Sequence, residues 1–159
     1  MEIIQCSFLK FCLRFGIREV PKECLRILGR TLQERKKNSI YLCMQGKKAV
    51  GYGVFRPLPP KYAFPQRGSI IGPYYVLSAC RGQGIGSALL KHMLAHAPKD
   101  GPVYAYVGIQ NKPSIAAFQH NGFEICGYME SCEGKFSISQ EKTGFFVLKA
   151  ERRTDPCKK

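Results

Sequence analysis

Three glycines at alternate positions, Gly82, Gly84 and Gly86, stand between an apolar run and a helical pattern. A turn of this kind can expose successive backbone N–H groups, because glycine adopts backbone conformations that other residues avoid. The helix that follows adds its positive N-terminal end. We therefore expect a strand, a tight turn and a helix whose junction binds phosphate or pyrophosphate.

Two well-known phosphate-binding designs do not explain this turn. The phosphate loop of nucleotide hydrolases needs Lys and then Ser or Thr after its last glycine, where this chain has Ser87-Ala88. That design is excluded. The dinucleotide fingerprint G-x-G-x-x-G would place Ser87 at its third glycine, and the next predicted strand, which ends near Ile109, supplies no acidic residue for a ribose. That design fits only weakly.

The remaining pattern predicts short strands alternating with helices. Ser7 is placed as the N-cap of a helix that closes at Gly16, and Pro21 suits the first turn of a second helix. Gly72-Pro73 predicts an irregular middle in one strand. The expected order is β-α-α-β-β-β-α-β-α-β-β, in a single domain over 1–150 with a charged tail over 151–159. The predicted strands are 1–6, 41–44, 49–55, 69–78, 103–109, 123–129 and 144–150, and the last two helices follow Gly84 and Pro113.

The composition fits one folded, strongly basic domain. The 159 residues are 45% hydrophobic, which excludes a disordered chain, and they carry a formal net charge of +14. The charge favours anionic partners and leaves open nucleic acid, a membrane surface, an acidic protein and a phosphorylated cofactor. No RNA-binding aromatic motif or zinc finger accompanies the charge, so a nucleic-acid-binding domain is disfavoured.

The eight cysteines are predicted to be reduced core thiols. None forms a C-x-x-C pair, several stand in apolar runs, and we expect no export signal and no membrane span. A cytoplasmic protein is therefore expected. His92 and His96 have a spacing that can bind metal, but no third ligand accompanies them, so no metal site is predicted.

A third design for the glycine turn, R-x-x-G-x-G/A, is met by Arg81, Gly84 and Gly86, and here the sequence resembles the GNAT superfamily of acyl-CoA-dependent N-acyltransferases. Val76 stands five residues before Arg81, as in that family. A further stretch, Asn111-x-x-Ser114-Ile115-x-x-Phe118-x-x-x-Gly122-Phe123, is similar to the second cofactor motif of the family. The resemblance covers about 41–150, whereas 1–40 match only as a weak two-helix pattern.

The resemblance implies a mixed α/β fold, with a central, mostly antiparallel sheet, splayed fourth and fifth strands and about four flanking helices. It implies acetyl-CoA as cosubstrate, with the pantetheine arm between the splayed strands and no metal. Backbone groups near Tyr74 and Val76 would pair with pantetheine. The other implied cofactor-binding residues are Arg81, Gly82, Gln83, Gly84, Ile85, Gly86 and Ser87 at the pyrophosphate, and Asn111, Ser114 and Phe118 along the arm and thiol end.

Two positions depart from the family pattern. Many relatives have Tyr where this chain has Phe118, and relatives that act on lysine often have Glu where it has Ile70. The usual general acid and base are therefore missing from their usual places. The catalytic candidates that remain are Tyr74 and a backbone N–H near Val76 or Leu77 as oxyanion donor, with Leu77 the assigned residue.

The function expected from these features is N-acetyl transfer to a primary amine by direct attack in a ternary complex. An α-amine with a pKa of about 7.7–8.0 is partly neutral at pH 7, whereas a lysine amine of about 10.4 needs a base. We therefore expect a small-molecule or peptide amine of low pKa, such as an amino sugar or an α-amine. No specific nucleic acid or membrane partner is expected, and we expect a monomer or a homodimer. The alternative, suggested by Phe118 and Ile70, is a non-catalytic acyl-CoA-binding module.

Overall fold

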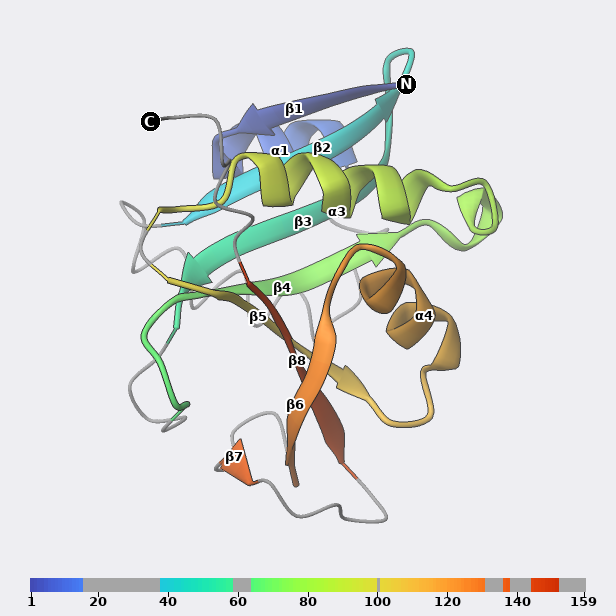
Figure 1. Cartoon of the computed structure of the whole chain (residues 1–159). Coiled ribbons are helices and arrows are strands. Elements are labelled where there is room, and N and C mark those ends of the chain that lie inside the picture. Colours follow the sequence, from blue (N-terminus) through green and yellow to red (C-terminus); the bar gives the residue numbers. More distant parts are fainter. Residues whose placement is uncertain (16–37, 59–63, 100, 131–135, 138–143, 152–159) are drawn as a thin grey trace, which may run out of the picture. The chain divides into compact units, whose positions relative to one another are not determined.

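The computed structural model describes residues 1–15, 38–58, 64–99, 101–130, 136–137 and 144–151. The chain forms two compact units. Met1–Pro57 and Ile70–Ala97 make the first unit, and Leu58–Ser69 and Pro98–Lys159 make the second. Figure 1 labels the elements of both.

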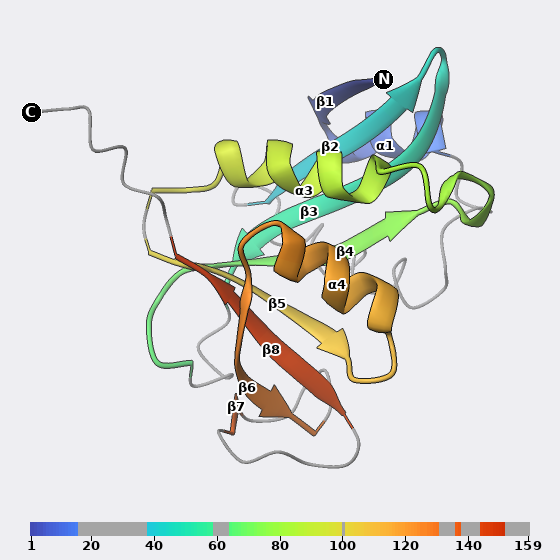
Figure 2. The same cartoon turned by 45° about the vertical axis from the view of Figure 1, so that its right-hand side comes forward.

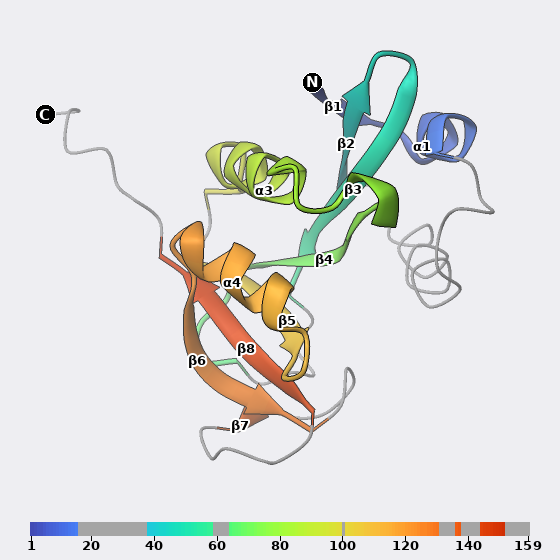
Figure 3. The ribbon, with the colours of Figure 1, turned by 90° about the vertical axis from the view of Figure 1, so that its right-hand side faces the viewer.

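The first unit is a sheet with a helix on each face. Its strands follow the order β1-β2-β3-β4, and both β1 and β3 pair with β2 in antiparallel orientation. Figure 3 shows α1 and α3 on opposite sides of β2 and β3, and both helices contact these strands. The elements are β1 (Glu2–Cys6), α1 (Phe8–Phe15), β2 (Ser39–Gln45), β3 (Lys48–Pro57), β4 (Ser69–Val76), the 3-10 helix η3 (Ser78–Cys80) and α3 (Ile85–Ala95).

Local chemistry explains the start of this unit. Ser7 accepts a hydrogen bond on its side-chain oxygen from the Lys10 N–H at 3.4 Å, as predicted for the N-cap of α1. The β2–β3 hairpin turns where Gln45 pairs with Lys48, and Gly46 adopts φ +59° there. This left-handed conformation is easiest for glycine, so the predicted hairpin is confirmed together with its turn.

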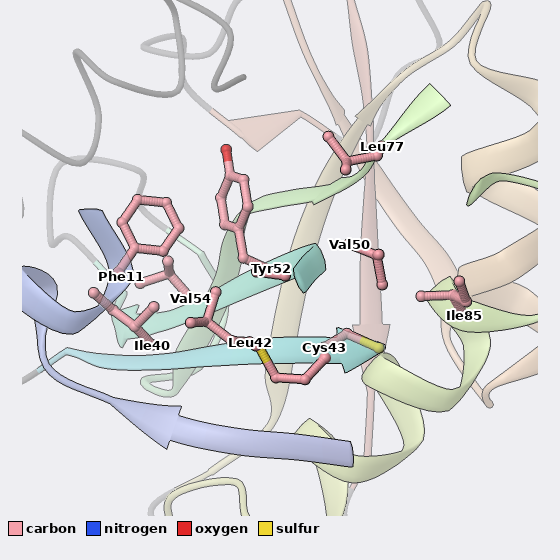
Figure 4. Close-up of a cluster of buried hydrophobic side chains, with 11 residues drawn as sticks. Phe11, Ile40, Leu42, Cys43, Val50, Tyr52, Val54, Leu77 and Ile85 are labelled. Carbon is pink, nitrogen blue, oxygen red and sulfur yellow. The ribbon is translucent and has the colours of Figure 1, made fainter. Parts of the chain in front are cut away.

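Alternation along the strands sends side chains to both helices. Phe11 of α1 packs its ring against the edge of Tyr52, with centroids 5.0 Å apart (Figure 4). Tyr41 instead meets His92 of α3, at 5.8 Å. Both faces of the sheet are therefore buried. The core cluster consists of Phe11, Ile40, Leu42, Cys43, Met44, Ala49, Val50, Tyr52, Val54, Leu77 and Ile85.

The second unit is an antiparallel sheet with the order β5-β8-β6-β7 (Figure 2). The helix of this unit is α4 (Lys112–His120), and Asn111 caps its N-terminus. The helix ends at Asn121-Gly122, as predicted, and Gly122 adopts φ +86°. The elements are β5 (Val103–Gly108), α4 (Lys112–His120), β6 (Glu124–Met129), β7 (Phe136–Ser137) and β8 (Phe145–Ala150).

The described elements match most of the predicted order. They include three α-helices, fewer than the four expected, because the helix predicted from Pro21 lies outside the described residues. Of the tail predicted over 151–159, all but Glu151 also lies outside them. The strand predicted with an irregular middle is present as β4, which runs through Gly72 and Pro73, and a cis peptide bond joins these two residues. The short elements η3 and β7 were not predicted from the sequence.

Two features of the described residues bear on other predictions. None of the described helices has the length and apolar character needed to cross a membrane. Cys6, Cys43, Cys80 and Cys126 are free thiols. Burial raises the pKa of Cys6 to about 11 and shifts the pKa values of Cys43 and Cys126 upward as well. Thiols with raised pKa values are less reactive at neutral pH.

Candidate active site

The turn from β4 to α3 contains two glycines, Gly82 and Gly84, in left-handed backbone conformations. The 3-10 helix η3 follows β4, and the Cys80 N–H closes it by donating to the Leu77 carbonyl at 2.8 Å. Gly82 and Gly84 then adopt φ values of +76° and +74°. A Cβ atom at either position would meet no atom within 4 Å. Backbone conformation, rather than lack of room, therefore selects glycine at both positions.

The N-terminal end of α3 presents backbone N–H groups. Gly84 is the N-cap and provides no side-chain cap, and the first helical hydrogen bond runs from the Ala88 N–H to the Gly84 carbonyl at 3.0 Å. The N–H groups of residues 85–87 precede that bond and lie at the positive end of the helix. Ile85 is 2% exposed and anchors this end in the core. Such an arrangement fits a diphosphate.

Arg81 is held against the end of β4. Its Nε donates to the Val76 carbonyl oxygen at 3.1 Å, and its guanidinium carbon lies 5.5 Å from the centroid of the Tyr75 ring. Tyr75 in turn packs on Tyr52, at 5.9 Å. The guanidinium stays exposed, so its charge remains at the turn. Gln83 makes a weaker tether, donating from Nε2 to the Ala79 carbonyl at 3.4 Å.

Tyr74, predicted as a catalytic candidate, packs beneath α3. A Cβ at Gly86 would lie 2.6 Å from the Tyr74 hydroxyl oxygen, and one at Gly53 would lie 3.4 Å from the Tyr74 ring. Burial raises the pKa of Tyr74 far above its ordinary value, with a smaller contribution from Cys43. The hydroxyl therefore stays protonated at neutral pH and cannot act as a base. This packing argues for a structural role of the side chain.

The Leu77 N–H, predicted as an oxyanion donor, already has an acceptor. It donates to the Val50 carbonyl oxygen of β3 at 2.9 Å. An amide held in the sheet is not available to a developing oxyanion, so this prediction is not supported. Val76, the neighbouring residue considered from the sequence, is the candidate that we retain.

The second predicted motif lies in the second unit. The Asn111 Oδ1 accepts from the Ser114 N–H at 3.3 Å, so these two residues form the N-terminal cap of α4. Phe118 is 2% exposed and packs on Phe123, with centroids 4.9 Å apart. The predicted cofactor residues thus fall into two sets, one in each unit.

Two residues important to the turn were missed from the sequence. Tyr75 supports Arg81, and Gly53 leaves room on β3 for Tyr74 and for Met93 of α3. Strict alternation along β4 would have separated Tyr74 from Tyr75, because neighbouring side chains of a strand point to opposite faces.

Ile70, which stands where a carboxylate base is found in some relatives, is fully buried.

The two histidines of α3 form a stacked pair. The rings of His92 and His96 have centroids 4.3 Å apart, and His96 Nδ1 lies 2.9 Å from the His92 carbonyl oxygen. The part of the chain that the structure describes contains no group of three or more side chains able to hold a metal ion.

Comparison with known proteins agrees with this geometry. The family model described as "Acetyltransferase (GNAT) family" matches residues 7–123. The "Putative phosphinothricin acetyltransferase YwnH" of Bacillus subtilis (strain 168) is 43% identical over 55 residues, which span 33% of this chain and 34% of that protein. The chain therefore matches about a third of the length of this curated relative.

Solved structures share the fold at low sequence identity. The ribosomal-protein-alanine N-acetyltransferase of Brucella melitensis has a TM-score of 0.70 and 22% identity, over 96% of this chain and 100% of that one. A GNAT family acetyltransferase of Elizabethkingia anophelis with acetyl-CoA bound has a TM-score of 0.65 and 16% identity, over 94% and 98% of the two chains. These likenesses show the mixed α/β fold of the family.

Proposed function

The chain belongs to the acetyltransferase (GNAT) family, and from this premise we propose that it transfers the acetyl group of acetyl-CoA to a primary amine. The observation that carries the proposal is the turn from Arg81 to Ser87. It combines two left-handed glycines, a helix N-terminus without a side-chain cap and a tethered arginine. These are the features that favour a diphosphate, and CoA contains one.

We assign the cofactor contacts by the chemistry of each segment. The N–H groups near the start of α3, with Arg81, would hold the pyrophosphate. Backbone groups of Tyr74 and Val76 on β4 would pair with pantetheine. Asn111, Ser114 and Phe118 of the second unit remain part of the proposal on the strength of the family resemblance.

Bound acetyl-CoA supplies an activated acyl carbon, to which the amine nitrogen bonds as the carbon–sulfur bond breaks. The amine loses one proton, and the CoA sulfur leaves as a thiolate that takes up one proton to become the free thiol. The Val76 N–H is our candidate for stabilising the oxyanion. A thiolate is a fair leaving group, because the pKa of its thiol is about 8.5, so the presence of Phe118 in place of a tyrosine slows the reaction without abolishing it.

The acceptor that we propose is an amine of low pKa on a small molecule or a peptide. Buried Ile70 replaces the base that would deprotonate a lysine, and burial keeps the Tyr74 hydroxyl protonated. The name of the Brucella enzyme states an alanine acceptor on a ribosomal protein, and that of the Bacillus relative states phosphinothricin. Both names are compatible with acceptors other than a lysine side chain.

The test is an assay of CoA release with matched acceptors at pH 7. One peptide offers a free N-terminal amine and no lysine, and its partner has a blocked N-terminus and one lysine. We expect faster release with the first peptide. Preference for the lysine peptide would refute the proposed acceptor class. Binding of acetyl-CoA without turnover on any amine would favour the second candidate, a non-catalytic acyl-CoA-binding module, which the presence of Phe118 and Ile70 supports.

A further inference from the structure

We propose that Tyr74 is a positioning residue for the pyrophosphate site, and that it acts through Gly86. This inference rests on the proposed function. Gly86 lies in the first turn of α3, and a Cβ there would stand 2.6 Å from the Tyr74 hydroxyl oxygen and 3.7 Å from Val76 Cγ2. The first of these distances is too short for any real Cβ contact. With Tyr74 in place, the end of α3 therefore lies so close to β4 that a Cβ at residue 86 would require the helix end or the Tyr74 side chain to move.

The same side chain also borders the neighbouring strand, β3. Tyr74 lies against Gly53 of the neighbouring strand, where a Cβ would be 3.4 Å from its ring. Two glycines on different elements thus leave the space that this one tyrosine occupies. Tyr74 sets the spacing between β4 and α3 at the point where the N–H groups of the helix are presented.

The constraint on Gly86 differs in kind from the constraints on the other two glycines of the turn. Gly82 and Gly84 have positive φ values and open space where a Cβ would stand, so their constraint is local. Gly86 has no positive φ and is limited by the space that Tyr74 occupies. The small third residue of R-x-x-G-x-G/A is thereby explained by a partner on β4.

The position of the helix end matters for function, because a diphosphate site depends on where the backbone N–H groups at the start of α3 lie. A shift of the helix end by about an ångström alters every hydrogen bond to the two phosphates and can cost about 100-fold where alignment matters. The opposite face of the strand end is held by Arg81 and Tyr75. Contacts on both faces of β4 therefore position the turn: Tyr74 with Gly86 on one face, and Tyr75 with Arg81 on the other.

The test is a double-mutant cycle with Gly86→Ala, Tyr74→Phe and the two combined. We expect Gly86→Ala to weaken acetyl-CoA binding by about tenfold, because the methyl group pushes the helix end away from β4. Tyr74→Phe removes the facing oxygen and should cost about threefold or less. In the double variant the methyl group gains that space, so binding should recover by at least about threefold relative to Gly86→Ala.

A second readout separates positioning from general loss of stability. Acetyl-pantetheine lacks the pyrophosphate, so turnover of this analogue should fall far less in Gly86→Ala than turnover of acetyl-CoA. Gly46→Ala is the matched control, because Gly46 lies in the β2–β3 turn at φ +59° and outside the site. That change should lower the melting temperature and leave acetyl-CoA binding unchanged.

The outcomes distinguish the two proposals. Suppose that the wild type binds acetyl-CoA and that the losses of affinity in the two single variants simply multiply in the double variant. This result would overturn the role of Tyr74 and leave the proposed function standing. Equal losses with acetyl-CoA and acetyl-pantetheine would also overturn the role of Tyr74. Failure of the wild type to bind acetyl-CoA would overturn the proposed function and, with it, the positioning role.

Discussion

The Nε of Arg81 donates a hydrogen bond to the Val76 carbonyl oxygen, 3.1 Å away, and so ties the first residue of the glycine motif to the last residue of β4. The five-residue spacing between these residues is the length of the loop that this bond closes. The ring of Tyr75 supports the guanidinium from one side. Arginine at this position therefore shapes the turn as well as adding charge.

Replacing Arg81 by Gln should weaken acetyl-CoA binding by about tenfold, and replacing it by Lys by about threefold to tenfold, because lysine keeps the charge but loses the planar stack and tether. Calorimetric titration measures both effects. Lys91→Gln is the control, since Lys91 is exposed on α3 and its removal changes net charge equally. An equal loss in Lys91→Gln would assign the effect to overall charge.

The rate should depend on pH through the acceptor more than through the enzyme. With Ile70 buried and the pKa of Tyr74 raised, we expect kcat/KM to rise with pH up to the pKa of the acceptor amine and then level off. Acceptors of different amine pKa should shift that inflection accordingly. A fixed inflection with every acceptor would reveal an enzymic base.

Acidification should destabilise the first unit through His92. Burial lowers the pKa of His92, and His96 lowers it further. The unfolded chain then takes up a proton near pH 6.5 while folded His92 does not, so stability falls as pH decreases through about 6.5. Denaturant unfolding at pH 7.5 and 5.5 measures the loss. His92→Gln should reduce it, whereas His120→Gln, on the exposed end of α4, should not. An unchanged loss in His92→Gln would contradict this account.

Local features of the fold could be predicted because they depend on neighbours in sequence. The Ser7 cap, the Gly46 turn and the Asn121-Gly122 helix end each follow from one or two residues. The β7 strand could not be predicted, since it has two residues and exists through pairing with β6. Its stability comes from a partner that no local pattern reveals.

The site shows the same division. The glycine turn and the start of α3 could be predicted from spacing and residue type. The role of the Leu77 N–H could not, because its acceptor, the carbonyl of Val50, is distant in the chain. The packing of Tyr74 against Gly86 also escaped prediction, since alternation separates Tyr74 from Tyr75 but does not say which face α3 will cover.

The central claim is that the turn before α3 binds the pyrophosphate of acetyl-CoA, and Gly84 gives the sharpest test. Asp and Asn have nearly the same size, and both tolerate the left-handed conformation at φ +74° better than most residues. Only Asp adds a negative charge beside the phosphates. Circular dichroism should confirm that both variants are folded.

Calorimetric titration of acetyl-CoA into wild type, Gly84→Asn and Gly84→Asp is therefore the most direct measurement. We expect tight wild-type binding, a loss of about tenfold or less for Asn, and a loss of about 100-fold or more for Asp. Equal binding by the Asp and Asn variants, or no binding by the wild type, would contradict the claim.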